Sequence, residues 1–163
     1  MKRLILMRHA KSSWNDPATD DHDRPLNGRG RTSARLLGNW LKARQYSPDQ
    51  TLCSDARRTR ETLAGLEIRC DAQFLNRLYH AGPGDLLDVL RGAKGDCVLL
   101  LGHNPGIGQL ARGLVDRPPA HPRFLAYPTG ATLVADIDIA AWADLGPGTA
   151  CPADFVTPRD LMG

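Results

Sequence analysis

Two short apolar runs constrain the fold of this chain most, because a histidine follows each of them. Residues 3–8 (RLILMR) lead into His9, and residues 96–101 (DCVLLL) lead through Gly102 into His103. Continuous apolar runs of this length are typical of strands that are buried on both faces of a sheet. We therefore expect both histidines at the ends of central strands.

Helical patterns alternate with the strand patterns along the chain. We predict helices at about 30–44, 57–64 with a stop near Gly65, 85–91 and 107–115. Further strands are predicted at 51–53, 67–70 and 131–139, a polar loop at 11–26, a proline-rich surface excursion at 116–129 and an irregular tail from Gly146. This alternation predicts a three-layer α/β/α sandwich with a largely parallel sheet, formed by residues 1–163 as a single domain.

The charge balance is only mildly basic. Twenty-one Lys and Arg residues against eighteen Asp and Glu residues leave a formal net charge of +3. This suits an anionic substrate but does not indicate nucleic acid. The apolar run Leu4–Met7 is too short for a signal peptide, and no later run is long enough to span a membrane. We expect a cytoplasmic protein with no membrane partner.

The residues that commonly bind metals do not form a recognisable metal motif. The four cysteines contain no CxxC pair, which predicts reduced, mostly buried thiols: Cys53, Cys70, Cys97 and Cys151. Residues 20–23 (DDHD) suggest a metal site, but a polar surface loop explains them better because no ligand geometry is defined there. We therefore expect no metal and no other cofactor.

Three groups of polar residues follow predicted strands: Arg8-His9, Ser54 to Arg58, and His103. In open α/β sheets, ligands bind beyond the carboxyl ends of the strands. The guanidinium of an arginine matches the oxygens of a phosphate, and a neutral imidazole can attack phosphorus. A second histidine can donate hydrogen bonds as charge shifts in the transition state. The three groups together predict a pocket for phosphoryl transfer.

The same residues resemble the motifs of a known family. Residues 8–15 (RHAKSSWN) resemble the RHGESxWN signature of the histidine phosphatase superfamily, which includes phosphoglycerate mutases. Residues 54–62 resemble its second signature, a serine followed four residues later by a phosphate-binding arginine. Residues 102–106 (GHNPG) resemble the second-histidine motif of the SixA-like phosphohistidine phosphatase branch. Further matches to that branch are RPLN at 24–27 with Gly30, Tyr79 after Leu78, and PTGA at 128–131.

The resemblance implies a role for each matching residue. His9 is implied to be the nucleophile that becomes phosphorylated, Arg8 and Arg58 to hold the phosphate, and His103 to complete the pocket. Asn15 is implied as a further polar contact to the phosphate.

Neighbouring residues have simpler explanations. Asn104 is a second candidate phosphate ligand, although Asn104 and Pro105 also suit the N-cap and first position of the next helix. Arg57 and Arg60 are expected on a solvated helix face, and Ser54 is expected only to end its strand. Trp14 is a candidate for the mouth of the site.

Three departures from the family pattern bear on the chemistry. Ala10 replaces the usual glycine, and Lys11 replaces the usual glutamate, which adds positive charge near the pocket. Residues 75–79 (LNRLY) contain no carboxylate where many members have a general acid. Imidazole leaves more easily than an alkoxide, so the missing acid favours phosphohistidine as substrate. Asp21, Asp55 or His80 could still supply the proton; the candidates stay open.

The resemblance and the missing acid together predict a metal-independent phosphatase that acts on phosphohistidine in proteins. We see no insertion large enough to form a lid, so a protein side chain could enter the site. Alternatives are a small-molecule phosphomonoesterase, a non-catalytic phosphoprotein-binding module and a metal-dependent hydrolase. The sequence leaves the oligomeric state open and is compatible with a monomer.

Overall fold

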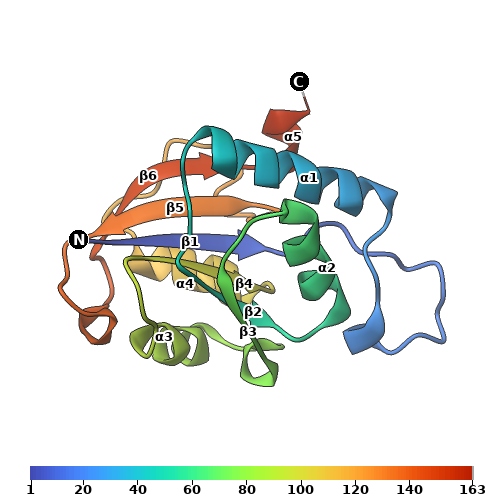
Figure 1. The fold of residues 1–163 in the computed structure, drawn as a ribbon, viewed down its shortest axis with the longest axis horizontal. Helices are drawn as coiled ribbons and strands as arrows, with labels where there is room; N and C mark the ends of the chain where they lie inside the picture. The colour runs from blue at the N-terminus through green and yellow to red at the C-terminus, as the bar shows by residue number, and fades with distance from the viewer. Residues whose placement is uncertain (163) are drawn as a thin grey trace.

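The computed structural model describes residues 1–162, which form one sheet with helices on both faces (Figure 1). The strands are β1 Lys2–Arg8, β2 Gln50–Ser54, β3 Asp71–Leu75, β4 Cys97–Gly102, β5 Thr132–Ile137 and β6 Ala150–Val156. The α-helices are α1 Gly28–Ala43, α2 Arg57–Leu66, α3 Pro83–Arg91, α4 Gly106–Leu114 and α5 Pro158–Leu161. Short 3₁₀ helices are η1 Asp21–Asp23, η2 Asn76–Leu78 and η3 Trp142–Asp144.

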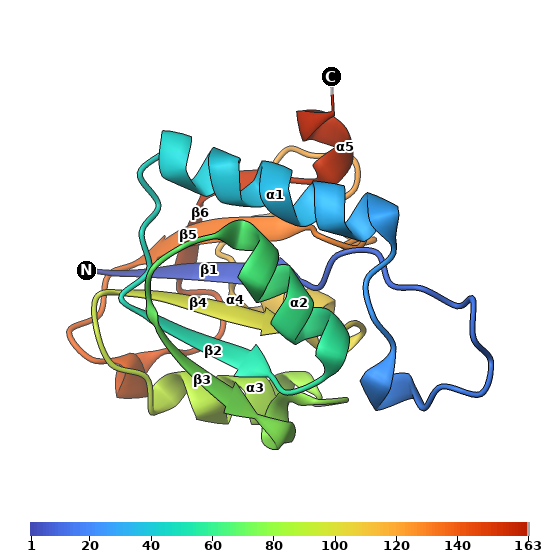
Figure 2. The same cartoon turned by 45° about the vertical axis from the view of Figure 1, so that its right-hand side comes forward.

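The six strands lie in the order β3-β2-β4-β1-β5-β6. The first four in this order are parallel to their neighbours, and β5 and β6 extend the sheet with antiparallel pairing. The predicted three-layer α/β/α fold with a largely parallel sheet is thus confirmed. The carboxyl ends of β1, β2 and β4 lie at the same edge of the sheet (Figure 2), where Arg8 pairs with Gly102.

Both faces of the central strands are buried. Ile5 and Met7 of β1 pack with leucines of α1 and α2, whereas Leu4 and Leu6 pack on the opposite face with side chains from α3 and α4. Because each face has a hydrophobic core, β1 has an apolar run and no alternation of apolar and polar residues. This packing fixes the strand ends rigidly.

The start of α1 holds the segment that follows His9. Asn27 caps the helix by accepting a hydrogen bond from the Gly30 amide, and α1 begins at Gly28, two residues before the predicted start. A Cβ at Gly30 would lie 2.0 Å from the carbonyl oxygen of Lys11, so only glycine allows this close approach. The segment after β1 is therefore fixed against α1.

Near α2, the helix ends at Leu66, two residues after the predicted end at Ala64, and the next predicted strand is displaced. Gly65 does not stop the helix: it lies inside α2 against the Ala34 side chain of α1, and the helix ends where Glu67 adopts the left-handed conformation. The strand predicted at 67–70 lies at Asp71–Leu75 instead, because residues 67–70 form the turn and irregular segment that follow α2.

The last third of the chain is more ordered than predicted. The tail from Gly146 contains β6 and α5, so β5 is not the last strand. The segment 116–129 is not only a surface excursion, because Phe124 and Tyr127 are buried and the Tyr127 hydroxyl donates to the Leu6 carbonyl at 2.6 Å. Pro105 takes the N-cap position of α4 in place of Asn104, so Gly106 is the first helical residue.

The structure of residues 1–162 also bears on the cysteines, on possible metal ligands and on the character of the helices. All four cysteines are free, as predicted, but only Cys53 is buried and Cys151 is exposed. Within residues 1–162, no group of three or more His, Cys, Asp or Glu side chains is arranged to hold a metal ion. None of the helices described for these residues has the length and apolar character needed to cross a membrane.

Candidate active site

His9 lies directly after β1 and is only 5% exposed. Its Nδ1 lies 2.7 Å from the carbonyl oxygen of Ala10. A carbonyl can only accept, so Nδ1 carries the proton and Nε2 keeps its lone pair. Burial, together with the charges of Arg58 and Arg8, lowers the pKa of His9 from 6.5 to about 3. His9 is therefore a neutral imidazole with a free nucleophilic nitrogen near neutral pH.

His103 faces His9 from the end of β4, with 5.3 Å between the ring centroids. Its Nε2 lies 2.8 Å from Ser54 Oγ at the end of β2. Ser54 Oγ already accepts the Ala56 amide, so the hydroxyl proton is available to His103 and Nδ1 can carry the imidazole proton. Burial and the neighbouring His9 lower the pKa of His103 to about 2.

Two arginines complete the surroundings of His9. Arg58, in the first turn of α2, donates from Nη1 to the Asp21 carbonyl at 2.7 Å and from Nη2 to the Asp21 carboxylate at 3.1 Å. Arg8, at the end of β1, donates from Nη1 to the Tyr127 carbonyl at 3.2 Å. These contacts fix the guanidinium groups but leave the Nε–H of each without a partner.

In the described part of the chain, three buried nitrogens at this site have no hydrogen-bond partner: Arg8 Nε, Arg58 Nε and His103 Nδ1. Buried polar groups in folded proteins are almost always paired. Unpaired N–H donors beside a neutral histidine therefore indicate a place for an acceptor ligand. The negatively charged oxygens of a phosphate can accept hydrogen bonds from all three of these donors.

These side chains line a pocket of about 300 Å³. The lining residues carry an excess of positive charge, with Asp21 as the one carboxylate: Arg8, His9, Lys11, Ser12, Trp14, Asp21, Arg24, Arg58, His80, His103, Asn104 and Thr129. This composition favours an anionic ligand.

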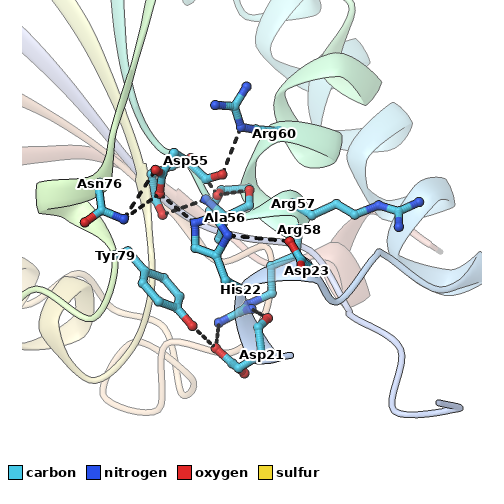
Figure 3. A network of polar contacts seen from close by, with 12 residues as sticks. Asp21, His22, Asp23, Asp55, Ala56, Arg57, Arg58, Arg60, Asn76 and Tyr79 are labelled. Carbon is cyan, nitrogen blue, oxygen red and sulfur yellow. Dashed lines mark hydrogen bonds and ion pairs between the residues drawn. The ribbon is translucent and has the colours of Figure 1, made fainter. Parts of the chain in front are cut away.

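Asp21 reaches the pocket from η1 and accepts hydrogen bonds from two sides (Figure 3). Arg58 donates from one side and the Tyr79 hydroxyl from the other, at 2.5 Å. Burial acts to raise the pKa of Asp21, but the Tyr79 hydrogen bond and the Arg58 charge outweigh it and lower that pKa. Burial and Asp21 together raise the pKa of Tyr79 to about 12. Asp21 is therefore an ionised acceptor that orients Arg58.

A second contact holds η1 in place. His22 Nε2 lies 2.8 Å from the carboxylate of Asp55, which also accepts hydrogen bonds from Asn76 (Figure 3). The hydrogen bond to Asp55 raises the pKa of His22. Asp55 does not line the pocket and is committed to His22, so this candidate for a general acid lies outside the site.

The structure places the two asparagines predicted as phosphate ligands differently, Asn15 outside the pocket and Asn104 in its lining. Asn15 is exposed, does not line the pocket, and uses its backbone amide to bond Ser13 Oγ. Asn104 lines the pocket, but its amide donates to the Tyr127 carbonyl at 2.9 Å and accepts from the Gly108 amide at 3.1 Å. Its side chain therefore ties α4 to the segment before β5.

Other residues singled out in the sequence lie at the mouth of the pocket or outside it. Arg57 and Arg60 do not line it: Arg57 donates to Glu61, and Arg60 donates to the Asp55 carbonyl (Figure 3). Trp14 lies at the mouth, 74% exposed, with Arg24 stacked 3.4 Å from its ring centre. Lys11 also lines the mouth.

Sequence reasoning missed two contacts that shape the site. It did not find that Ser54 bonds His103, a residue 49 positions away, or that Asp21 orients Arg58, which is 37 positions away. No local pattern joins residues so far apart. The fact that Ser54 and His103 both follow predicted strands was the one usable signal.

Comparisons with known proteins agree with the geometry. The model of the histidine phosphatase superfamily (branch 1) matches residues 4–85. An uncharacterized protein of Mycobacterium tuberculosis is 38% identical over 160 residues, which cover 94% of this chain and all of that protein. Phosphohistidine phosphatase SixA of Escherichia coli is 29% identical over 127 residues, covering 72% of this chain and 78% of SixA.

A solved structure gives the same result for the fold. The Nakamurella multipartitia protein, solved as a candidate phosphohistidine phosphatase SixA, superimposes with a TM-score of 0.86 at 31% identity. The superposition covers 96% of each chain. Together with the site geometry, these matches show that the chain belongs to the histidine phosphatase superfamily (branch 1) and is a phosphatase.

Proposed function

We propose that this protein dephosphorylates phosphohistidine in proteins, without a metal ion, through a phosphorylated His9. The observation that carries the proposal is the set of three unpaired buried nitrogens around a neutral His9. Donors fixed in this way stabilise the charge of a transferring phosphoryl group without rearranging during the reaction.

In the first step, the lone pair on His9 Nε2 attacks phosphorus and the bond from phosphorus to the leaving nitrogen breaks. The proton on His9 Nδ1 is shared with the Ala10 carbonyl, which supports the positive charge that develops on the ring. Arg8, Arg58 and His103 donate to the phosphoryl oxygens. Water then attacks the phosphorus of phosphorylated His9. The bond between phosphorus and His9 Nε2 breaks, which releases inorganic phosphate and restores His9.

The state of the nearby carboxylates supports phosphohistidine as the substrate. Asp21 is ionised and Asp55 lies outside the pocket, so neither supplies a proton to a leaving alkoxide. A phosphohistidine nitrogen protonates readily and leaves as imidazole, so it needs no strong acid. The open mouth beside the exposed Trp14 suits a protein side chain.

A second candidate is a phosphomonoesterase for small molecules. His80 favours it, because its side chain lines the pocket, is 62% exposed, and has Nε2 3.4 Å from Asp21. From this position it could protonate an alkoxide. A non-catalytic binding module is a weaker candidate, because such a module has no need of a free nucleophile at His9.

The test is phosphate release from a phosphohistidine peptide and a phosphoserine peptide of the same sequence, with a strong chelator present. Wild type is compared with His9→Ala. We expect release from the phosphohistidine peptide alone, abolished in the variant. Faster release from phosphoserine would favour the phosphomonoesterase, with His80→Gln as the follow-up. Loss of activity with chelator, restored by a divalent cation, would overturn metal independence.

A further inference from the structure

A second, larger pocket adjoins the His9 pocket. It measures about 530 Å³ and shares Arg8, Lys11 and Thr129 with the first. Its other lining residues come from the start of α1, the segment before β5, and α5 with its flanking residues: Arg29, Ser33, Arg123, Pro128, Thr157, Pro158, Arg159 and Met162.

The lining of this second pocket is strongly basic. Five of its residues are cationic and none is acidic: Arg8, Lys11, Arg29, Arg123 and Arg159. Across residues 1–162, none of these five forms an ion pair, although many other arginines of the chain do. Like charges gathered in a concave surface attract counter-ions and anionic ligands.

Arg123 adds an independent observation. Its Nε is buried and has no hydrogen-bond partner among residues 1–162, the same state as Arg8 Nε and Arg58 Nε in the first pocket. A buried N–H without a partner is rare in a folded protein and marks a place that an acceptor can fill. Both pockets therefore contain an unpaired arginine donor, and Arg8 lies between them.

We propose that this second pocket binds a further anionic group of the substrate, a carboxylate or a phosphate, while the phosphoryl group lies at His9. The proposal rests on the proposed function only in requiring a phosphorylated substrate. For a phosphoprotein, the second group is an Asp or Glu side chain near the phosphohistidine. For a small molecule, it is a second phosphate.

Binding measurements separate these sources. One pair of ligands is a peptide with a stable phosphohistidine analogue flanked by Glu, against the same peptide flanked by Gln. The other pair is an alkanediol bisphosphate against the monophosphate. The protein variants are Arg29→Gln with Arg159→Gln as a double substitution, and Arg123→Gln alone. None of these residues lies in the His9 pocket.

A matched control removes two charges elsewhere. Lys42 and Arg69 are exposed and have no side-chain partner among the hydrogen bonds or ion pairs of the described chain, so Lys42→Gln with Arg69→Gln gives the same change in net charge. This control separates a local subsite from general attraction between the protein and anions. Unfolding midpoints in urea check that every variant is folded.

In one of the two ligand pairs, we expect the double variant to bind the ligand that carries the second anion about tenfold more weakly than wild type does. Its binding of the ligand without that anion should change little, and so should the binding of both ligands by the control variant. A loss confined to the Glu peptide assigns the subsite to acidic protein segments, and one confined to the bisphosphate assigns it to small molecules. Equal loss for both members of each pair, equal loss in the control, or no preference of wild type for the second anion would overturn the proposal.

Binding also keeps this proposal separate from the function proposed above. If the protein binds the Glu peptide preferentially but does not hydrolyse phosphohistidine peptides, the subsite stands and the proposed function fails. If it hydrolyses both phosphohistidine peptides equally, and binds neither the Glu peptide nor the bisphosphate more tightly than the partner ligand of that pair, the function stands and the subsite fails.

Discussion

The two sides of the His9 pocket are built in different ways. The strand side, defined as His9, Ser54 and His103, follows three parallel strands, and each residue is at most 5% exposed. The loop side, defined as Trp14, Asp21 and His80, comes from η1 and from segments outside the strands and α-helices. Its side chains are much more exposed, at 40% for Asp21 and 62% for His80.

This difference suggests a division of labour. The strand side is fixed by a packed sheet and by short hydrogen bonds, as charge stabilisation in phosphoryl transfer requires. The loop side is more exposed and is held by polar contacts and by ring stacking, such as that of Tyr79 on His80 with 3.9 Å between ring centroids. Arg58 connects the two, because it lies beside His9 and is oriented by Asp21. Substitutions should therefore cost more activity on the strand side than on the loop side.

The largest effect, apart from loss of His9 itself, is expected at Arg58. Arg58→Gln removes a buried donor to the phosphoryl group and should lower kcat/KM by about 10²–10³-fold. Arg57→Gln is the matched control, because Arg57 is the adjacent residue and points to Glu61 on the surface. It should change kcat/KM less than about twofold. Similar losses in both variants would mean that the assignment of Arg58 is wrong.

A smaller effect is expected on the loop side. Asp21→Asn keeps one acceptor oxygen but removes the charge that orients Arg58, so kcat/KM should fall by about tenfold. Asp23→Asn serves as the control, since Asp23 is 69% exposed and lies next to His22 without touching Arg58. An unchanged or higher kcat/KM in Asp21→Asn would show that Asp21 does not position Arg58.

The smallest effect is one of pH on stability, and its sign differs between His9 on the strand side and His22, the residue of η1 next to Asp21. Burial lowers the pKa of His9 to about 3, so its contribution to stability is present above pH 6.5 and is lost as pH falls. His22 has a raised pKa because of Asp55, so its contribution is present at low pH and is lost as pH rises.

Urea unfolding between pH 5 and pH 8 measures both effects. The urea concentration at the unfolding midpoint of wild type should decrease as the pH is lowered below 6.5, because His9 and His103 take up protons on unfolding. The penalty of His22→Gln should be larger at pH 5 than at pH 8. A penalty that grows with pH would contradict the raised pKa of His22.

From the sequence, His9 and His103 could be predicted at strand ends. Asp21 and His80 could be named only as open candidates, without the contacts that place them. The end of an apolar run that is buried on both faces marks the end of its strand, so the local pattern predicts where His9 and His103 lie. The contact from Asp21 to Arg58 depends on how the loop at 11–26 folds back onto α2, which no local pattern encodes.

The wrong predictions for β6 and for the segment before β5 also arise because local pattern does not encode contacts between distant segments. Strand β6 lies at the edge of the sheet, contains Pro152, and pairs across an irregularity between Val134 and Ala135, so its strand pattern is weak. The proline-rich segment before β5 has the composition of a loop, yet it buries Tyr127 against Leu6. That contact becomes visible only when β1 and β5 pair.

The central claim is that His9 itself becomes phosphorylated, and trapping this intermediate tests it most directly. The protein is mixed with a ³²P-labelled phosphohistidine peptide, denatured within milliseconds in alkali, digested and sequenced by mass spectrometry. We predict one acid-labile, alkali-stable phosphoryl group on His9, absent from His9→Ala and unaffected by a chelator. Label on another residue, or turnover without any labelled protein in wild type and full activity in His9→Ala, would contradict it.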